Sequence, residues 1–280
     1  MSYKMLVSDL DETFLNDDGT IHKENVRAIK QATAKGFKFV PNTGRSFKSV
    51  QNMLKELGLF DQADQYVISY NGAAIVENHG NRVIATQDMP VSLAKQIVAA
   101  GYLSNQIDVH IYTVDKLFIY DLNESDKHYM ATRGVTYEEI NQLDLSFLDR
   151  EQPIMKVIFE NEDATIQRQI HDAVLETVGS DSVEATYSSG RYVEFNLQGV
   201  DKGSASLLLG KKLDIKSSEI MAAGDNNNDL KMITAVGLGV SVANGITSVK
   251  AAADFVTQRT NNEGAIAEIL DQFEIGRAHV

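Results

Sequence analysis

The chain has 280 residues, of which 43% are hydrophobic and 23% charged, so it is long enough for one large globular domain or two ordinary ones. Its net charge of −13 has no basic stripe to offset it, which argues against a nucleic-acid partner, and the absence of cysteine excludes disulfides and thiolate metal sites. Because the N-terminus lacks a signal-peptide pattern and no apolar run approaches membrane-spanning length, we expect a cytoplasmic protein without a membrane partner.

Short apolar strands alternate with amphipathic helices in the first part of the chain. The expected strands and the helices between them are, in order, Met5–Val7, 26–32, Phe37–Val40, 50–57 and Tyr66–Ser69. Gly36 and Gly58 follow the two helices as C-terminal caps. Continuous apolar strands that alternate with helices predict an α/β fold, a doubly wound parallel sheet with right-handed crossovers.

The pattern changes between about Val83 and Tyr192. Residues 108–113 and 116–121 alternate in polarity, which predicts an antiparallel hairpin with one solvent-facing side. A strand at 154–159, a long helix at 166–178 and a second hairpin formed by 183–187 and 192–197 follow. We therefore expect an α+β domain at 84–192, inserted into a core domain formed by 1–83 and 193–280. Residues 275–280 continue no pattern.

Charged and polar residues follow four of the candidate core elements. They are Asp9 and Asp11, Thr43-Gly44-Arg45, Lys202 at a helix start, and the run Gly224–Asp229. Loops at the carboxyl ends of parallel strands converge on one crevice, so we expect these residues to lie together. Each loop also has a plain alternative: a charged turn, a helix-entry turn, a solvated lysine, and a helix cap at Asp229.

Four ordered motifs in these loops carry a resemblance to a known family. They are Asp9-Leu10-Asp11-Glu12-Thr13, Thr43-Gly44-Arg45, Asp201-Lys202-Gly203, and Gly224-Asp225 with Asn228-Asp229. In this order they resemble the motifs of the haloacid dehalogenase superfamily. The insert between the second and third motifs is similar to the class IIB cap of the Cof-type phosphatases. The resemblance implies a Rossmann-like core domain and a cap domain that acts as a lid.

Three positions depart from the family pattern. Glu12 stands where Gly is common, Asn42 stands where a small residue usually precedes Thr43, and residues 195–198 lack a proline. None of them touches a reacting group, and Glu12 and Asn42 bear only on the geometry of their loops.

The resemblance assigns a role to each charged residue of the motifs. It makes Asp9 the nucleophile that forms an aspartyl-phosphate, and Asp11 the acid that protonates the leaving oxygen and then activates water. Mg²⁺ would bind Asp9, the backbone carbonyl of Asp11 and Asp225, as a hard cation among oxygen ligands. Lys202 would add a second positive charge.

Further residues would hold the phosphate and support the lysine. Thr43 and the Gly44 amide would bind non-bridging phosphate oxygens, with Asn228 nearby. Asp229 would hydrogen-bond Lys202 or a metal-bound water. Three basic residues are candidate substrate contacts: Arg45, His128 and Arg191.

The predicted function is Mg²⁺-dependent hydrolysis of phosphomonoesters of small metabolites, either sugar phosphates or a phosphorylated cofactor. A phosphomutase on the same scaffold is an alternative, although no residue pattern marks a second phosphate site. A catalytically silent regulator that binds a metabolite is another. The sequence indicates neither the particular substrate nor the oligomeric state.

Overall fold

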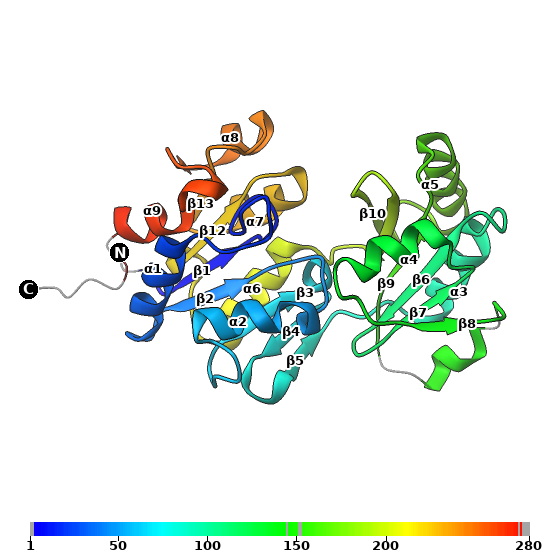
Figure 1. Ribbon diagram of the computed structural model, residues 1–280, viewed down its shortest axis with the longest axis horizontal. Helices are drawn as coiled ribbons and strands as arrows, with labels where there is room; N and C mark the ends of the chain where they lie inside the picture. The colour runs from blue at the N-terminus through cyan, green and yellow to red at the C-terminus, as the bar shows by residue number, and fades with distance from the viewer. Residues whose placement is uncertain (1–2, 144, 151–152, 274, 276–280) are drawn as a thin grey trace, which may run out of the picture. The chain divides into compact units, whose positions relative to one another are not determined.

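The computed structural model describes residues 3–143, 145–150, 153–273 and 275, so the stretch 276–280, where the sequence pattern stops, lies outside the described residues. The chain forms two compact units, one made of Met1–Ala85 with Asp201–Val280 and the other of Thr86–Val200 (Figure 1). The expected boundary after Tyr192 is too early. Strand β11, Tyr192–Leu197, pairs with β9 and β10 inside the sheet of the insert, and this pairing keeps it in the second unit.

The first unit is built on a five-stranded parallel sheet in the order β14-β13-β12-β1-β2. In chain order its strands are β1 Met5–Ser8, β2 Lys38–Pro41, β12 Ile220–Gly224, β13 Leu238–Ser241 and β14 Phe255–Val256. Figure 1 shows β1, in blue, beside β12, in gold, although the insert separates them in the sequence. The carboxyl ends of β1, β2 and β12 consequently share one edge of the sheet.

Helices cover both faces of this sheet. The helices of the unit are α1 Lys23–Thr33, α2 Gln51–Leu57, α6 Lys202–Lys212, α7 Leu230–Ala235, α8 Thr247–Ala252 and α9 Ala265–Gln272. Met5 and Val7 of β1 share a buried cluster with Leu209 of α6 and Met232 of α7. Leu6 points to the opposite face and is also fully buried, and α1 packs against α9. The predicted doubly wound α/β core is confirmed.

Strand β3, Tyr66–Ser69, differs from the prediction. It is not a member of the parallel sheet but pairs antiparallel with β4, Ala74–Glu77, and only a single bridge between Asn42 and Ile68 links it to β2. Strand β5, Arg82–Thr86, completes this small sheet. The antiparallel pairing of β3 with β4 follows from residues 70 and 71, which come directly after β3. Their φ angles of 55° and 56° reverse the chain at once and leave no room for a crossover helix.

The insert contains a six-stranded sheet in the order β10-β11-β9-β6-β7-β8. Its strands, besides β11, are β6 Asp108–Thr113, β7 Leu117–Tyr120, β8 Glu138–Ile140, β9 Ile154–Glu160 and β10 Val183–Ser188. The helices α3, Val91–Gly101, and α5, Ala164–Val178, pack together on one face, over alternate strand residues such as Val109, Val157 and Val193. Both predicted hairpins are present.

The other face of this sheet is not solvent-facing, so that part of the prediction is wrong. Helix α4, Glu124–Ala131, lies over it: Met130 packs on Ile119, and Asp126 lies 2.9 Å from His110 of β6. The polar residues Asp108 and His110 are 0% and 1% exposed as a result. Polarity that alternates along a strand therefore identified the strand here, but not the environment of its polar face.

Short 3₁₀ segments complete the described structure at Phe47–Val50, Tyr70–Gly72, His79–Asn81, Leu145–Arg150, Ser217–Glu219, Asn227–Asp229 and Asn261–Glu263. Among the described residues, no helix has both the length and the apolar character needed to cross a membrane.

Candidate active site

The carboxyl ends of β1 and β12 bring two aspartates to one edge of the core sheet. Ser8 of β1 lies opposite Ala223 of β12, and the backbone amide of Asp9 donates to the Ala223 carbonyl at 3.0 Å. Asp225 follows the end of β12. Both side chains are largely buried, since Asp9 is 8% and Asp225 4% exposed. Buried carboxylates need compensating partners, and the neighbouring residues supply some of them.

Lys202 is buried against these aspartates. Asp201 caps helix α6 by accepting hydrogen bonds from the amides of Gly203 and Ser204, which places Lys202 in the first turn. The ammonium Nζ lies 2.6 Å from Asp9 Oδ1 and 2.7 Å from Oδ1 of Asp229, and the residue is 2% exposed. The alternative of a solvated surface lysine is therefore wrong.

Asp229 connects the lysine to the loop after β12. Its Oδ2 accepts hydrogen bonds from the backbone amides of Asp225, at 3.0 Å, and Asn226, at 3.1 Å, while its Oδ1 binds Lys202. A side chain at Gly224 would overlap the Asp229 side chain, so the close approach needs a glycine. Asp229 is 0% exposed and thus fixes both the loop and the lysine.

Asn42, expected to bear only on the geometry of its own loop, also supports the lysine. Its Nδ2 donates to the backbone carbonyl of Lys202 at 3.0 Å and to Ser206 Oγ at 3.3 Å, and the residue is 0% exposed. The larger residue before Thr43 therefore ties the end of β2 to the first turn of α6. Because the family pattern has a small residue at this position, the pattern does not predict this hydrogen bond.

Two threonines lie in the same loops. Thr13 Oγ1 donates to Asp225 Oδ1 at 2.5 Å, and Thr43 Oγ1 accepts from the backbone amide two residues further on at 3.1 Å. The loop after β2 also packs closely on Asn71. Gly44 lies so near to it that an added Cβ would be only 3.0 Å from Asn71 Oδ1. Asn71 was not among the predicted site residues, although Asn is one of the non-glycine residue types that adopt a positive φ most often.

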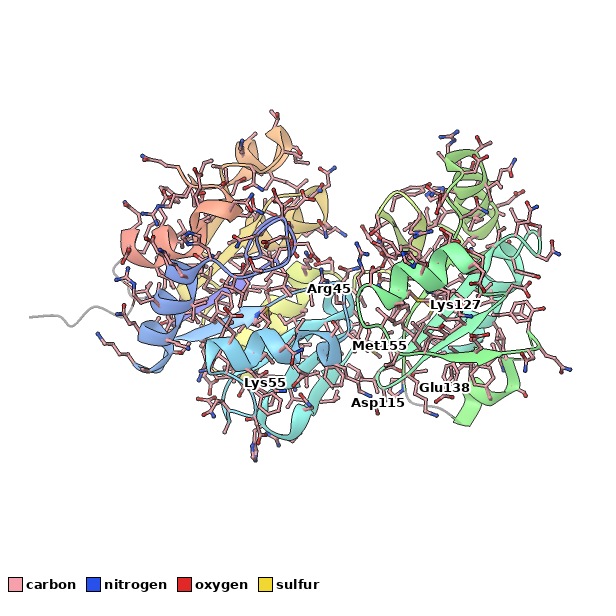
Figure 2. All side chains as sticks on the ribbon, in the orientation of Figure 1. Arg45, Lys55, Asp115, Lys127, Glu138 and Met155 are labelled. Carbon is pink, nitrogen blue, oxygen red and sulfur yellow. The ribbon has the colours of Figure 1, made fainter. Side chains whose placement is uncertain are left out.

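Asp11 and Asn228 lie apart from this buried group. The Asp11 carboxylate is about half exposed and forms an ion pair with Arg45, whose Nε lies 3.1 Å from Asp11 Oδ2. Figure 2 shows Arg45 at the surface of its unit. Asn228 is exposed on the turn before Asp229. Glu12 adopts a left-handed φ of 59°, which explains why glycine is common at this position of the motif.

The two candidate substrate contacts of the insert have different environments. His128 is exposed on α4. Arg191 is buried, and its guanidinium donates to Glu160, Glu162 and Ser125. Because its donors are committed to neighbours within the insert, Arg191 has a structural role there and is not a free surface contact.

The charges of the buried group in the core do not balance. Burial raises the pKa of Asp9 well above its ordinary value, although Lys202 opposes the shift. Burial also raises the pKa of Asp225 to about 6, against the hydrogen bond from Thr13. Three carboxylates, those of Asp9, Asp225 and Asp229, face one ammonium, so two negative charges remain uncompensated when all are ionised.

This group fits a hard divalent cation. One carboxylate oxygen from each of the three aspartates lies within 4.8 Å of the others, and all the donors are oxygens. Oxygen-only donor sets suit Mg²⁺ and similar ions, and a charge of +2 would offset the excess negative charge. The cation would neutralise the two negative charges that Lys202 leaves uncompensated.

The sequence as a whole places the chain in a family. Residues 6–270 match the haloacid dehalogenase-like hydrolases, and the chain belongs to this family, as its four motifs indicated. Over 97% of this chain and 99% of the other, the fold is similar to that of the class IIB sugar phosphatase BT4131, with a TM-score of 0.80 and 22% identity. The matched length includes the insert.

Relatives define the activity more closely. YxeH of Bacillus subtilis is 31% identical over 98% of this chain and 100% of its own length. The 5-amino-6-(5-phospho-D-ribitylamino)uracil phosphatase YcsE, also of Bacillus subtilis, is 29% identical over 95% of this chain and 94% of its own. The protein is a phosphatase of the haloacid dehalogenase type, a phosphoric monoester hydrolase.

Proposed function

We propose that this phosphatase hydrolyses phosphomonoesters of small metabolites, sugar phosphates or a phosphorylated cofactor, with Mg²⁺ and through an aspartyl-phosphate on Asp9. The observation that carries the proposal is the position of Asp9, at the end of β1, 2.6 Å from a buried lysine and within a group of three buried carboxylates. The phosphorylated ribitylamino-uracil substrate of the relative YcsE supports a small, phosphorylated substrate.

Asp9 is the nucleophile in this proposal. Its Oδ1 is bound to Lys202, which orients the carboxylate so that Oδ2 can attack phosphorus. The bond from phosphorus to the ester oxygen breaks, and the alcohol leaves with a proton from Asp11. Water then gives a proton to Asp11 and attacks the phosphorus of the aspartyl-phosphate, which releases phosphate and restores Asp9.

Asp11 must leave its partner to take part. Its carboxylate is paired with Arg45 in the structure, and both side chains are about half exposed, so breaking this pair costs about 1 kcal/mol or less. Arg45 then becomes available to the phosphate. We assign the remaining phosphate contacts to Thr43, the Gly44 amide and Asn228.

Lys202 keeps its charge throughout. Burial acts to lower its pKa, but Asp229 and Asp9 outweigh burial and raise the pKa above its ordinary value. The ammonium thus offsets part of the charge of the nucleophile and the phosphate. Asp9, the Asp11 carbonyl and Asp225 would hold Mg²⁺, whose positive charge would let an anionic ester approach an anionic nucleophile.

A panel of phosphate esters tests the proposal. It contains sugar phosphates, phosphorylated cofactors and the substrate of YcsE, each with Mg²⁺ and with chelator. We expect Mg²⁺-dependent phosphate release that falls by about 1,000-fold or more in Asp9→Asn, because the nucleophile is lost. Asp181→Asn, which removes an exposed carboxylate of the insert, should keep full activity.

Other outcomes would contradict the proposal. Release that persists in Asp9→Asn would exclude Asp9 as the nucleophile, and release that is unchanged by chelator would exclude the metal. Transfer of phosphate from a bisphosphate to a monophosphate, without net release, would favour a phosphomutase.

A further inference from the structure

The insert contains a second group of buried ionisable side chains, far in sequence from the core motifs. Asp108 and His110 lie two residues apart on β6 and therefore share a face of the sheet. Helix α4 presents Lys127 to solvent (Figure 2) and its neighbour Asp126 to the sheet. Asp108, His110 and Asp126 are 0%, 1% and 0% exposed, and one possible ligand atom from each lies within 4.8 Å of the others.

Three possible ligand atoms of this group, on His110 and Asp126, lack ordinary hydrogen-bond partners. Within the part of the chain that the structure describes, neither ring nitrogen of His110 has a hydrogen-bond partner, and nor does Asp126 Oδ2. His110 Nε2 lies 2.9 Å from Asp126 Oδ2, but the pair does not have the direction of a hydrogen bond. Buried polar atoms are almost always paired, so three unpaired atoms in one place call for an explanation such as a bound ion.

Neighbouring donors hold the two carboxylates in position. Asn123 donates its backbone amide to Asp108 Oδ2 and its side-chain amide to Asp108 Oδ1, both at 2.8 Å. The Tyr192 hydroxyl donates to Asp126 Oδ1 and leaves Oδ2 directed toward His110. Hydrogen bonds of this kind, which orient the ligands from behind, are a regular feature of metal sites in proteins.

Among the described residues, the carboxylates of Asp108 and Asp126 also lack a close cationic partner. Lys156 is paired with Glu194 at 2.6 Å, and Arg191 with Glu160 at 3.0 Å. Arg191 approaches the Asp126 carboxylate only to 4.0 Å. Among the buried groups described here, the two remaining carboxylates therefore carry two negative charges beside one imidazole.

We propose that Asp108, His110 and Asp126 form a metal site of the insert that takes a divalent transition-metal ion, with Zn²⁺ the best match. An imidazole nitrogen with two carboxylate oxygens is a donor set for Zn²⁺, whereas Mg²⁺ and Ca²⁺ prefer oxygen alone. The site differs in this respect from the oxygen-only group of the core. The ion would join α4 to β6, so its role is to stabilise the insert.

Zinc binding to the full-length protein tests the proposal. The protein is stripped with chelator and returned to excess Mg²⁺, which occupies the oxygen-only group, and Zn²⁺ alone is then titrated and the bound metal measured after dialysis. We expect one equivalent of zinc, which His110→Gln should lose on dialysis because it removes one of the three ligands. His128→Gln changes an exposed histidine of helix α4, which also carries Asp126, and should retain the full equivalent.

A variant of the core separates the two sites. Asp225→Asn removes a carboxylate of the oxygen-only group, so it should still bind the equivalent of zinc that His110→Gln loses. The proposal is overturned if no zinc is retained in excess Mg²⁺, or if the equivalent survives in His110→Gln or disappears in Asp225→Asn.

Crystals of the unchanged protein test the proposal even if the His110→Gln variant does not fold. Crystals of the unchanged protein soaked in Zn²⁺ should show an anomalous peak at bonding distance, about 2.0–2.1 Å, from a ring nitrogen of His110. A map without a peak beside His110 would overturn the proposal and leave the histidine and its two carboxylates as a proton-sharing network.

Discussion

Asp9→Asn and Asp229→Asn make the same chemical change at the two carboxylates that hold Lys202. Asp9 is bound to the lysine through Oδ1. Asp229 uses both oxygens, Oδ1 for the lysine and Oδ2 for two backbone amides. An amide side chain has only one acceptor oxygen. Asn at position 9 can therefore keep its bond to Lys202, whereas Asn at position 229 must turn its NH₂ group toward either the ammonium or the backbone amides.

The two variants should consequently differ in stability. We expect Asp229→Asn to lower the free energy of unfolding by about 3 kcal/mol, because it leaves buried donors without an acceptor and weakens a buried ion pair. Asp9→Asn should change it by about 1 kcal/mol or less. Burial already disfavours the charged form of Asp9, as its raised pKa shows, so losing that charge removes a cost as well as an attraction.

Urea unfolding followed by circular dichroism measures both variants against the unchanged protein. Chelator is present throughout, since a metal that binds only the folded state would add its own stabilisation. The reasoning is refuted if Asp9→Asn is destabilised as much as Asp229→Asn. That result would mean that the charge of Asp9 is needed for the fold and not for catalysis alone.

Four further substitutions, at three positions, test particular contacts. Gly224→Ala should lower the free energy of unfolding by about 1–3 kcal/mol in the same urea assay, since the added methyl overlaps Asp229; unchanged stability would contradict this packing. Glu12→Gly should stay within about 1 kcal/mol of the unchanged protein, because φ is 59° there, whereas Glu12→Val should be clearly less stable. Burial acts to raise the pKa of Glu194, but the attraction of Lys156 outweighs burial and lowers the pKa below its ordinary value of 4.5. The pair therefore stabilises the fold at neutral pH. This contribution is lost as the pH falls through the lowered pKa of Glu194. Glu194→Gln should therefore cost about 3 kcal/mol at pH 7 and less in acid, and a cost independent of pH would contradict the pairing.

The parallel core was predictable from sequence because its central strands β1, β12 and β13 are buried along their whole length. Met5–Val7 and its partner near 220–223 are continuous apolar runs, and a polar loop follows each of them. The residues that carry the chemistry follow the strand ends, so strand prediction also predicted which loops come together. The close group of Asp9, Asp225 and Lys202 is the structural consequence.

Other features depended on contacts that the local sequence does not specify. The hydrogen bond from Asn42 to Lys202 joins residues 160 positions apart, and no local pattern predicts it. The direction of β4 depends on left-handed conformations at Tyr70 and Asn71, neither of which is glycine. The burial of His110 depends on helix α4, which was not among the predicted elements. Long-range packing decided each of these cases.

Detection of the phosphorylated intermediate shows directly whether Asp9 is the nucleophile. The protein is mixed with Mg²⁺ and the best ester of the panel, quenched in acid within the first turnover, digested and analysed by mass spectrometry. We expect phosphate on the peptide that contains Asp9, and none in Asp9→Asn. Phosphate on another residue, or turnover with no phosphorylated peptide at any quench time, would contradict it.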